Sequence, residues 1–594
     1  PDGIDPTGGG AQITGLASLG EAKRLALVLQ TGALPVKFET VERTDVSATL
    51  GKDSLREARN AAIAGLLLVA IFLLAIYRFL GVVAVLGLAV YAALMYGAIL
   101  LLGVTLTLPG FAGLILTIGV AADANIVIFE RIKEEARAGR SVRAAIAAGY
   151  AKGFHTILDA NAVTCITALV LFAVATASVK GFALMLLLGT VISLLTAVAA
   201  TRAMLGLLAG FKWFDNPRFM GATALEIPKW QRIDVVGRRR LWFILSLVAI
   251  GLSIVAVAVK GLNLGIDFKG GVQITFTTPQ PTSLAAVREQ AADIGHGDAI
   301  VQGRGTQTGS DEYKSFQIRL KELKPSEQEQ LTTDLTDSLQ AEKLGVKNVS
   351  SSFSRQILRG ALLAIIVSFC LIALYVTLRY QWRFAVPILR TLVNDVLITL
   401  GVYAISGREV SAATVAAILT ILGYSIYDTI IVFDRIRENI KLMPRASIAR
   451  IANVSVWEVL RRSIFTSVIT LLPITALFIF GGATLQDFAF AIIVGIVIGA
   501  VGTIFIATPL LVTLMERDPE WARRKDEVGG KASVADLRAA EQAAAEEPAP
   551  RTPVDAIGEA VESLVGDGDV DGDQEAKRER RRQRRKARPH GRAR

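Results

Sequence analysis

The sequence predicts a polytopic α-helical membrane protein with about eleven spanning helices in two pseudo-symmetric halves, and a small ferredoxin-like α+β domain outside the membrane. Three observations support this prediction. Hydrophobic residues make up 52% of the 594 residues and the mean hydropathy is +0.48, which is more apolar material than a soluble fold of this size can hide. The apolar residues lie in long runs, and parts of the first set of runs recur in the second.

The apolar runs define the spans, since roughly 18 or more such residues cross a hydrocarbon core about 30 Å thick. They lie at approximately 60–79, 82–103, 109–129, 157–178, 182–208, 241–260, 357–378, 384–405, 411–433, 463–481 and 486–515. Lys and Arg gather in alternate connections, whereas the other short connections contain only Lys180 and Arg408. The positive-inside rule makes the basic connections cytoplasmic. Residues 1–58 and 262–356 are then expected outside, and the C-terminal tail inside.

The long external interval has the pattern of a folded domain. Alternating and helical spacings predict strands and helices in the order β-α-β-β-α-β, which is the ferredoxin-like pattern. The strands are expected at 272–278, 299–303, 315–320 and 346–353, and the helices at 283–294 and 325–344. The interval contains no obvious catalytic cluster.

The net charge of +11 does not indicate a nucleic-acid-binding domain, because residues 577–594 alone hold eleven Lys or Arg. We expect a disordered cytoplasmic tail there, with RNA, ribosomes or anionic lipid as alternative partners. No GxxxxGK[ST] loop occurs, so ATP binding by that route is excluded. Cys165 and Cys370 lie in apolar runs and suggest neither a disulfide nor a metal site, so no cofactor is expected. The polar start at Pro1 has no signal peptide and is expected to be a fragment boundary.

An internal repeat links the two membrane halves. ILTIGVAADANIVIFERIKEE at 115–135 resembles LTILGYSIYDTIIVFDRIREN at 419–439, at a constant offset of 304 residues. ITALVLF at 166–172 is echoed by ITALFIF at 474–480. Both copies of the first motif run from outside to inside, so the repeat is parallel, and a functional site is expected between the halves.

Two acidic residues lie inside this repeat. Asp123 is seven residues before Glu130, and Asp428 is six residues before Asp434, which puts each about 10 Å inside the cytoplasmic boundary. An acid at this depth costs on the order of 2.5–3.5 kcal/mol by insertion scales. A buried carboxyl group opposed by an arginine can exchange a proton near neutral pH. The alternative is that each aspartate only forms a hydrogen bond to a neighbouring helix. This alternative is less consistent with an aspartate in each of the two repeat motifs.

Other polar residues on neighbouring spans are candidates for the same seam. Those that we expect to support it are Asn125, Asp159, Asn161, Thr429, Thr466 and Ser467, and Asn394 with Asp395 are further candidates. Arg462 immediately precedes the apolar run that begins at Ser463, so spacing alone favours an arginine that snorkels at the cytoplasmic edge.

These motifs closely resemble the bacterial SecD and SecF proteins, joined in one chain. The SecD-like part includes TGALPVKFETVERTDVSATLGKDS at 31–54, VAADANIVIFERIKEE at 120–135 and TILDANAVT at 156–164. The SecF-like part includes GIDFKGG at 265–271, GYSIYDTIIVFDRIREN at 423–439 and RSIFTSVITLL at 462–472. The resemblance covers about four-fifths of the chain. It implies that the first transmembrane helix and most of the first periplasmic domain of SecD are missing, and that Tyr427 and Ser463 replace the Asn and Thr common in the family.

The resemblance also implies the domain order. We expect the end of a periplasmic domain at 1–58, a five-helix bundle at 59–210, a linker at 211–239, a first SecF-like helix at 240–264, the ferredoxin-like domain at 265–356, a second five-helix bundle at 357–516 and a basic tail at 517–594.

The function implied is that of an accessory subunit of the Sec translocase, of the RND superfamily, which uses the proton-motive force to promote preprotein translocation across the bacterial inner membrane. The proton relay of the family maps onto Asp123, Asp428 and Arg462. The implied partners are the SecYEG channel, SecA, unfolded preprotein and membrane lipid, with YajC and YidC as further candidates and no specific nucleic acid. The coupling ion is expected to be H⁺, with Na⁺ as the alternative.

Two alternative functions fit the sequence less well. A small-molecule efflux pump of the RND group would carry two large external insertions, whereas this chain has one of roughly 90 residues. A passive scaffold for the translocon would not need two matched aspartates in the membrane. The chain is therefore expected to be a translocation factor and not an enzyme.

Overall fold

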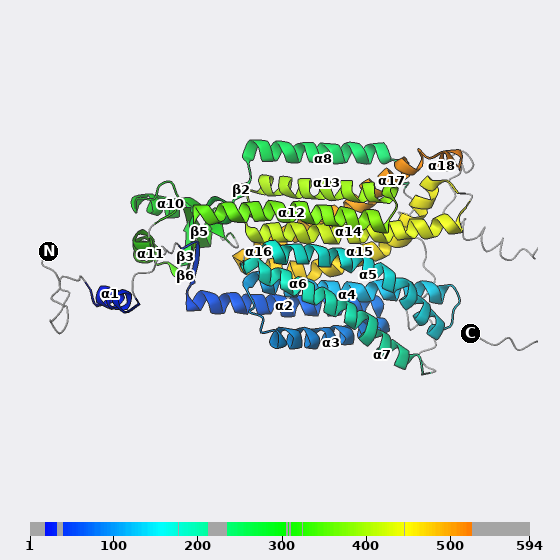
Figure 1. The fold of residues 1–594 in the computed structure, drawn as a ribbon, viewed down its shortest axis with the longest axis horizontal. Helices are drawn as coiled ribbons and strands as arrows, with labels where there is room; N and C mark the ends of the chain where they lie inside the picture. Colours follow the sequence, from blue (N-terminus) through cyan, green and yellow to red (C-terminus); the bar gives the residue numbers. More distant parts are fainter. Residues whose placement is uncertain are drawn as a thin grey trace, which may run out of the picture. The chain divides into compact units, whose positions relative to one another are not determined.

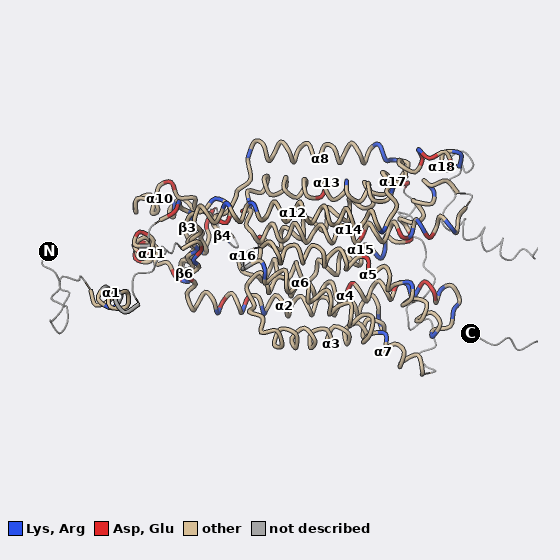
Figure 2. Tube along the Cα trace, in the orientation of Figure 1, with Lys and Arg blue, Asp and Glu red and all other residues tan. Residues whose placement is uncertain are grey.

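The computed structural model describes residues 18–31, 40–175, 177–211, 234–304, 307, 311–323, 325–444 and 446–524. Within these ranges, eleven helices are long and apolar enough to cross a membrane, which confirms the predicted polytopic helical fold. The helices run side by side, with a small sheet at one end (Figure 1). Charged residues gather at the two ends of the helices and are sparse between them (Figure 2). The predicted tail beyond Arg524 and most of the predicted linker lie outside the described residues.

Each half contains five spanning helices. The first half consists of α2 (Ala48–Tyr77), α3 (Phe79–Leu101), α4 (Leu108–Arg137), α5 (Val142–Val174) and a fifth span formed by α6 (Ala177–Leu195), the π-helical turn η1 (Thr196–Ala200) and α7 (Thr201–Leu208). The second consists of α12 (Ser351–Arg379), α13 (Trp382–Ser406), α14 (Ala412–Leu442), α15 (Ile448–Phe480) and a span formed by α16 (Ala483–Gly502), the π-helical turn η4 (Thr503–Ala507) and α17 (Thr508–Met515). The remaining span, α8 (Arg239–Lys260), precedes the sheet domain, and the short helices α1 (Leu19–Thr31) and α18 (Pro519–Arg524) lie outside the spans.

The repeat in the sequence produces matched local structure. Gly103 and Gly407 both have positive φ, of 58° and 66°, a conformation that glycine adopts without strain. Four residues later, Thr107 and Ser411 cap α4 and α14 with their hydroxyl groups, because the first amide groups of a helix need acceptors. The two halves therefore place their central helices in the same way.

Both fifth spans widen into a π-helical turn at the same relative place. The hydroxyl group of Thr201 donates to the carbonyl oxygen of Thr196 at 3.3 Å, and Thr508 donates to Thr503 in the same manner at 3.0 Å. Such turns interrupt a regular helix at a cost and are frequent at functional sites. Here each one lies where the last span of a half passes the central helices.

The halves meet through α4, α5, α14 and α15. Helix α15 packs against α2 and α4, and α5 packs in the matching way against α12 and α14. The apolar stretches of α4 and α14 are each 89% buried inside the protein, compared with 11% for that of α8. Helices α4 and α14 are therefore the central pair, and α8 is peripheral.

The sheet domain has the predicted ferredoxin-like topology. Its elements are β3 (Gly271–Ser283), α10 (Leu284–Asp293), β4 (Ile300–Arg304), β5 (Glu312–Leu320), α11 (Pro325–Leu339) and β6 (Glu342–Val349), and the strand order is β1-β6-β3-β5-β4 with every neighbouring pair antiparallel. The edge strand β1 (Glu42–Val46) comes from the segment before the first span. That segment and the external interval therefore build one sheet.

Two predicted boundaries in this domain are wrong. The helix expected to end at residue 344 ends at Leu339, because Gln340 takes a positive φ of 50° that a helix cannot accommodate. The last strand, expected at 346–353, lies at Glu342–Val349. Ser350 then caps α12, accepting a hydrogen bond from the amide of Phe353 at 3.3 Å, so the residues after it are helical.

Helix starts also fall before the predicted domain boundaries. Helix α2 begins at Ala48, ahead of the boundary expected between 58 and 59, and α12 begins at Ser351, ahead of the one between 356 and 357. Both helices thus extend out of their apolar runs toward the sheet. A parallel pair of two-residue strands, β2 (Asn263–Leu264) and β7 (Glu409–Val410), also lies at this end.

The repeat-matched glycines Gly119 and Gly423 give a test of the packing between the halves. A Cβ atom on Gly119 would lie 3.0 Å from the Cα of Thr470 in α15, whereas one on Gly423 would lie no closer than 3.4 Å to Thr164 in α5. We expect Gly119→Ala to destabilise the protein by about 1–3 kcal/mol, as overpacking does, and Gly423→Ala to be close to wild type. Thermal unfolding in detergent measures both, and equal effects of the two substitutions would contradict this account of the interface.

Candidate functional site

A small polar pocket lies where α4, α14, α15 and α16 meet. Asp123 of α4 and Asp428 of α14 both line it, and eight of its ten lining residues are polar. These eight are Asp123, Tyr424, Ser425, Tyr427, Asp428, Thr466, Ser467 and Thr470. The space open to the centre of a water molecule is about 20 Å³, which suits one or two waters held by several polar groups. The structure therefore brings to one site the aspartates of the two repeat motifs, which lie one residue apart in the register of the repeat.

Asp428 is held loosely by hydroxyl groups of α15. Thr466 Oγ1 and Ser467 Oγ each donate to one carboxylate oxygen of Asp428, both at 3.4 Å. These distances exceed the usual range for hydroxyl donors, and Thr466 also bonds the carbonyl oxygen of Ser463 at 3.0 Å. A carboxyl group held this weakly can exchange its partners for water or an ion.

Asp123 lacks a hydrogen-bond partner at one oxygen. Within the described residues, Asp123 Oδ1 and the hydroxyl groups of Tyr424 and Tyr427 are buried and make no hydrogen bond. Buried polar atoms are nearly always bonded to protein or to ordered water. All three residues line the pocket, which has room for a water molecule.

Arg462 is buried and does not snorkel. The residue is 5% exposed, and its Nε and Nη2 atoms have no hydrogen-bond acceptor among the described residues. Its charge acts on Asp123 and Asp428. The snorkelling expectation is wrong because α15 begins at Ile448, well before the apolar run, so residue 462 lies near the middle of a long helix. A guanidinium group buried without full hydrogen bonding is costly.

The other predicted residues divide into two groups. Thr466 and Ser467 line the pocket, and Thr429 next to Asp428 bonds Thr503 of η4 at 2.7 Å. Asn125 is buried and donates to the carbonyl oxygen of Ala121 at 3.0 Å, with its own oxygen unpartnered in the described structure.

Asp159 and Asn161 do not line the pocket. Asp159 forms an ion pair with Arg379 of α12 at 2.8 Å and accepts a hydrogen bond from Tyr375 at 3.1 Å. Asn161 is buried on the same helix, α5. Asp159 therefore ties α5 to α12 and is separate from the polar seam.

Sequence reasoning missed part of the pocket wall. Tyr424 and Ser425 precede Asp428 by four and three residues, and Thr470 follows Thr466 by four. Residues at these spacings lie on one face of a helix. A spacing of three or four residues from a predicted site residue is therefore the sequence signal that identifies these pocket residues.

A network of ion pairs lies at the end of the helices opposite the sheet. Its members occupy corresponding positions in the two copies of the repeat. Arg131 bonds Glu134 at 2.9 Å and Glu438 of the other half at 3.3 Å. Its counterpart Arg435 lies 2.9 Å from Glu438 and 3.9 Å from Glu134. Each arginine therefore binds the glutamate of its own helix and that of the other half, and the network joins α4 to α14.

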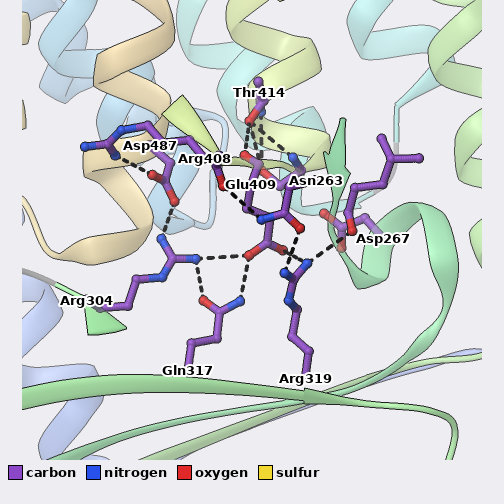
Figure 3. Close-up of polar contacts among 12 residues, drawn as sticks. Asn263, Asp267, Arg304, Gln317, Arg319, Arg408, Glu409, Thr414 and Asp487 are labelled. Atoms are coloured by element: carbon purple, nitrogen blue, oxygen red, sulfur yellow. Dashed lines mark hydrogen bonds and ion pairs between the residues drawn. The ribbon is translucent and has the colours of Figure 1, made fainter. Parts of the chain in front are cut away.

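A second ion cluster joins the sheet to the helices (Figure 3). Arg304 of β4 forms ion pairs with Asp487 of α16 and with Glu409 of β7, the latter at 3.0 Å. Gln317 of β5 donates to Glu409 at 2.6 Å. Arg408, one of the two basic residues expected in the external connections, bonds Asp487 at 2.6 Å. The cluster was not predicted, because it joins residues far apart in the sequence.

Asp267, in the GIDFKGG segment, fixes the start of α14. One carboxylate oxygen accepts the amide of Ala412 at 2.9 Å, and the other binds Lys347 of β6 at 2.6 Å. Burial alone would lower the pKa of Lys347, but Asp267 and Glu42 outweigh burial and raise it. The lysine therefore stays cationic, and the sheet remains attached to the helix that carries Asp428.

Two related helical halves with charged groups enclosed between them define a polytopic membrane protein with a polar seam. Residues 328–517 match the family "Protein export membrane protein SecD/SecF, C-terminal", residues 255–281 match "SecD/SecF GG Motif", and residues 45–242 match "MMPL family". The chain belongs to the SecD/SecF family of protein export membrane proteins.

Individual relatives extend this match over most of the chain. The protein translocase subunit SecDF of Thermus thermophilus is 37% identical over 86% of this chain and 69% of its own length. The SecDF subunit of Bacillus subtilis is 34% identical over 84% and 69%. The crystal structure of the Thermus SecDF, described as a translocon-associated membrane protein, has a TM-score of 0.75 over 85% of this chain and 68% of that one.

The sheet-end cluster gives a prediction with an internal control. Arg304→Gln removes the cation that Asp487 and Glu409 share and leaves each with one other, Arg408 or Arg319. We expect it to loosen β4 and β5 by about 1–3 kcal/mol, the cost of leaving a buried polar group partly unsatisfied. Lys321→Gln removes an exposed ion pair with Asp298 in the same domain and should be close to wild type, since water screens such pairs. Amide hydrogen exchange of the two strands measures the difference. Equal protection in both variants would contradict the role assigned to Arg304.

Proposed function

We propose that this protein is an accessory subunit of the Sec translocase that couples ion movement through the Asp123, Asp428 and Arg462 site to preprotein translocation. The observation that carries the proposal is a buried arginine with unfilled hydrogen-bonding capacity whose charge acts on two carboxyl groups that line one pocket, at the junction of two repeated halves. Translocase subunits named SecDF are 34–37% identical to this chain over 84–86% of its length. A passive scaffold would have no use for such costly groups.

The coupling follows from electrostatics. When Asp123 or Asp428 takes up a proton, its attraction for Arg462 falls, and when it releases the proton the attraction returns. Since these groups lie on α4, α14 and α15, each change alters the balance of forces between the halves. One charge moved through 100 mV supplies about 2.3 kcal/mol, so several ions per cycle are needed to drive a large motion.

Helices α14 and α16 transmit the motion to the sheet. The start of α14 is bonded to Asp267, and Asp487 of α16 is bonded to Arg304. In the proposed orientation the basic end of the bundle and the C-terminal tail are cytoplasmic, and the sheet lies outside the bacterial inner membrane. There the sheet would meet preprotein emerging from the SecYEG channel, while SecA acts from the other side. YajC and YidC are further proposed partners.

Protons are the proposed coupling ion, with Na⁺ as the alternative. The hydroxyl and carboxyl groups around Asp428 can pass a proton, and oxygen ligands of this kind also bind small cations. The choice is tested by collapsing the proton gradient and the sodium gradient separately during export into inverted vesicles.

Substitution of Asp428 tests the proposed function. Asp428→Asn keeps the size and the hydrogen-bond acceptor but cannot titrate, and we expect it to abolish the gradient-dependent stimulation of preprotein translocation in inverted vesicles. Asp428→Glu keeps the carboxyl group and should retain part of the stimulation. Both variants should insert and assemble normally, as checked by their level in the membrane and co-purification with the channel. Unchanged export by Asp428→Asn would refute the coupling mechanism.

A further inference from the structure

A third membrane-buried carboxyl group lies behind the pocket, on α13. Asp395 is 0% exposed, and both of its oxygens accept hydrogen bonds from neutral side chains. Ser425 Oγ of α14 donates to Oδ2 at 2.5 Å, and Asn394 Nδ2 donates to Oδ1 at 3.2 Å. Ser246 of α8 in turn donates to Asn394 Oδ1 at 2.8 Å. A continuous polar chain therefore runs from the peripheral helix α8 to α14.

No cationic side chain of the described structure balances Asp395. The helices packed against α13 are α8, α12, α14 and the span containing α16 and α17. The charged residues of α8 lie at its two ends, and Asp487 of α16 is bound in the sheet-end cluster. Arg379 of α12 is paired with Asp159, and Arg390 of α13 lies five residues before Asp395, on another face of the helix. Ser425 lies between Asp395, which it bonds, and the pocket that Asp428 and Tyr424 also line.

Ser425 connects Asp395 to the pocket. Its hydroxyl group bonds Asp395, while the residue itself lines the pocket that Asp428 also lines, three residues further along α14. Close packing maintains the connection, because a Cβ atom on Gly502 of α16 would lie 3.0 Å from Asp395 Oδ1. The π-helical turn η4 begins at the next residue.

The first half has no carboxyl group at the matching position. At the repeat offset of 304 residues, Asp395 corresponds to Tyr91 of α3. Tyr91 is also buried and also bonds its central helix, by donating to Thr117 Oγ1 of α4 at 2.7 Å. The helix contact is thus conserved between the halves, but only the second half places a titratable carboxyl group there. Packing alone does not require the acid.

We propose that Asp395 is a further ion-carrying group of this protein, which exchanges a proton with the Asp428 pocket through the hydroxyl group of Ser425. In one step a proton leaves the carboxyl group of Asp428 and is relayed by a water molecule in the pocket to the hydroxyl oxygen of Ser425, as Ser425 gives its own hydroxyl proton to the carboxylate of Asp395. One O–H bond breaks and one forms at each transfer, so one proton leaves Asp428 and one arrives at Asp395. The inference rests on the proposed function and extends its path from α14 toward α13 and α8.

The test uses the full chain in vesicles that contain a pH-sensitive dye, with an imposed proton gradient. Asp395→Asn preserves the size and the acceptor for Ser425 but cannot carry a proton. We expect it to slow proton uptake by about a hundredfold, the lower end of what a positioned proton-transfer group contributes. Ser425→Ala should slow uptake while leaving Asp395 in place. The matched control Tyr91→Phe removes the corresponding bond in the other half and should leave the rate close to wild type.

The outcomes separate this inference from the proposed function. Loss of uptake in Asp395→Asn and Ser425→Ala, with a wild-type rate in Tyr91→Phe, supports the extended path. Wild-type uptake in Asp395→Asn together with loss in Asp428→Asn overturns the inference and leaves the proposed function standing. Wild-type uptake in both Asp395→Asn and Asp428→Asn overturns the inference and the proposed function together. If Asp395→Asn fails to fold, as judged by its thermal unfolding in detergent, Ser425→Ala alone decides, and a wild-type rate in that variant overturns the inference.

Discussion

Burial of incompletely bonded charges between two helical halves is the constraint on which this structure depends. Asp123, Asp428 and Arg462 lie in the protein interior, and two of the three have polar atoms without a partner among the described residues. Such groups stay buried only where the packing of the surrounding helices keeps them from reaching water. Here α4 and α14 are the most enclosed spans, and close contact at Gly119 holds α15 against α4. The packing that holds the helices together therefore also keeps the charged site buried.

The repeat separates what holds the fold from what makes the site. Matched features include the caps Thr107 and Ser411, the two π-helical turns, and the arginines Arg131 and Arg435 that join the halves. The features without a counterpart are ionisable side chains. Arg462 corresponds to Phe154 at the offset of the ITAL motif, and Asp395 corresponds to Tyr91. Symmetric contacts keep the halves in register, whereas Arg462 and Asp395 occur in the second half alone and Asp123 is contributed by the first.

The sequence was sufficient for the spans and for the two aspartates, because hydropathy and depth depend only on local composition. Spacing alone misplaced the Arg462 side chain at the membrane edge, since the apolar run starts at Ser463 while the helix starts at Ile448. The end of α11 was misplaced because the positive φ of Gln340 leaves no trace in a polar sequence. The pairing of Asp159 with Arg379, and of Arg304 with Asp487, joins residues between 183 and 220 positions apart. Only the three-dimensional structure brings such residues together.

The attachment of the sheet limits how it can move. Arg304 holds Asp487 of α16 and Glu409 next to α14, and Asp267 caps α14 itself. The sheet is therefore bonded to both α14 and α16. Because α14 and α16 also form walls of the pocket, the proposed ion site and the sheet are attached to the same two helices.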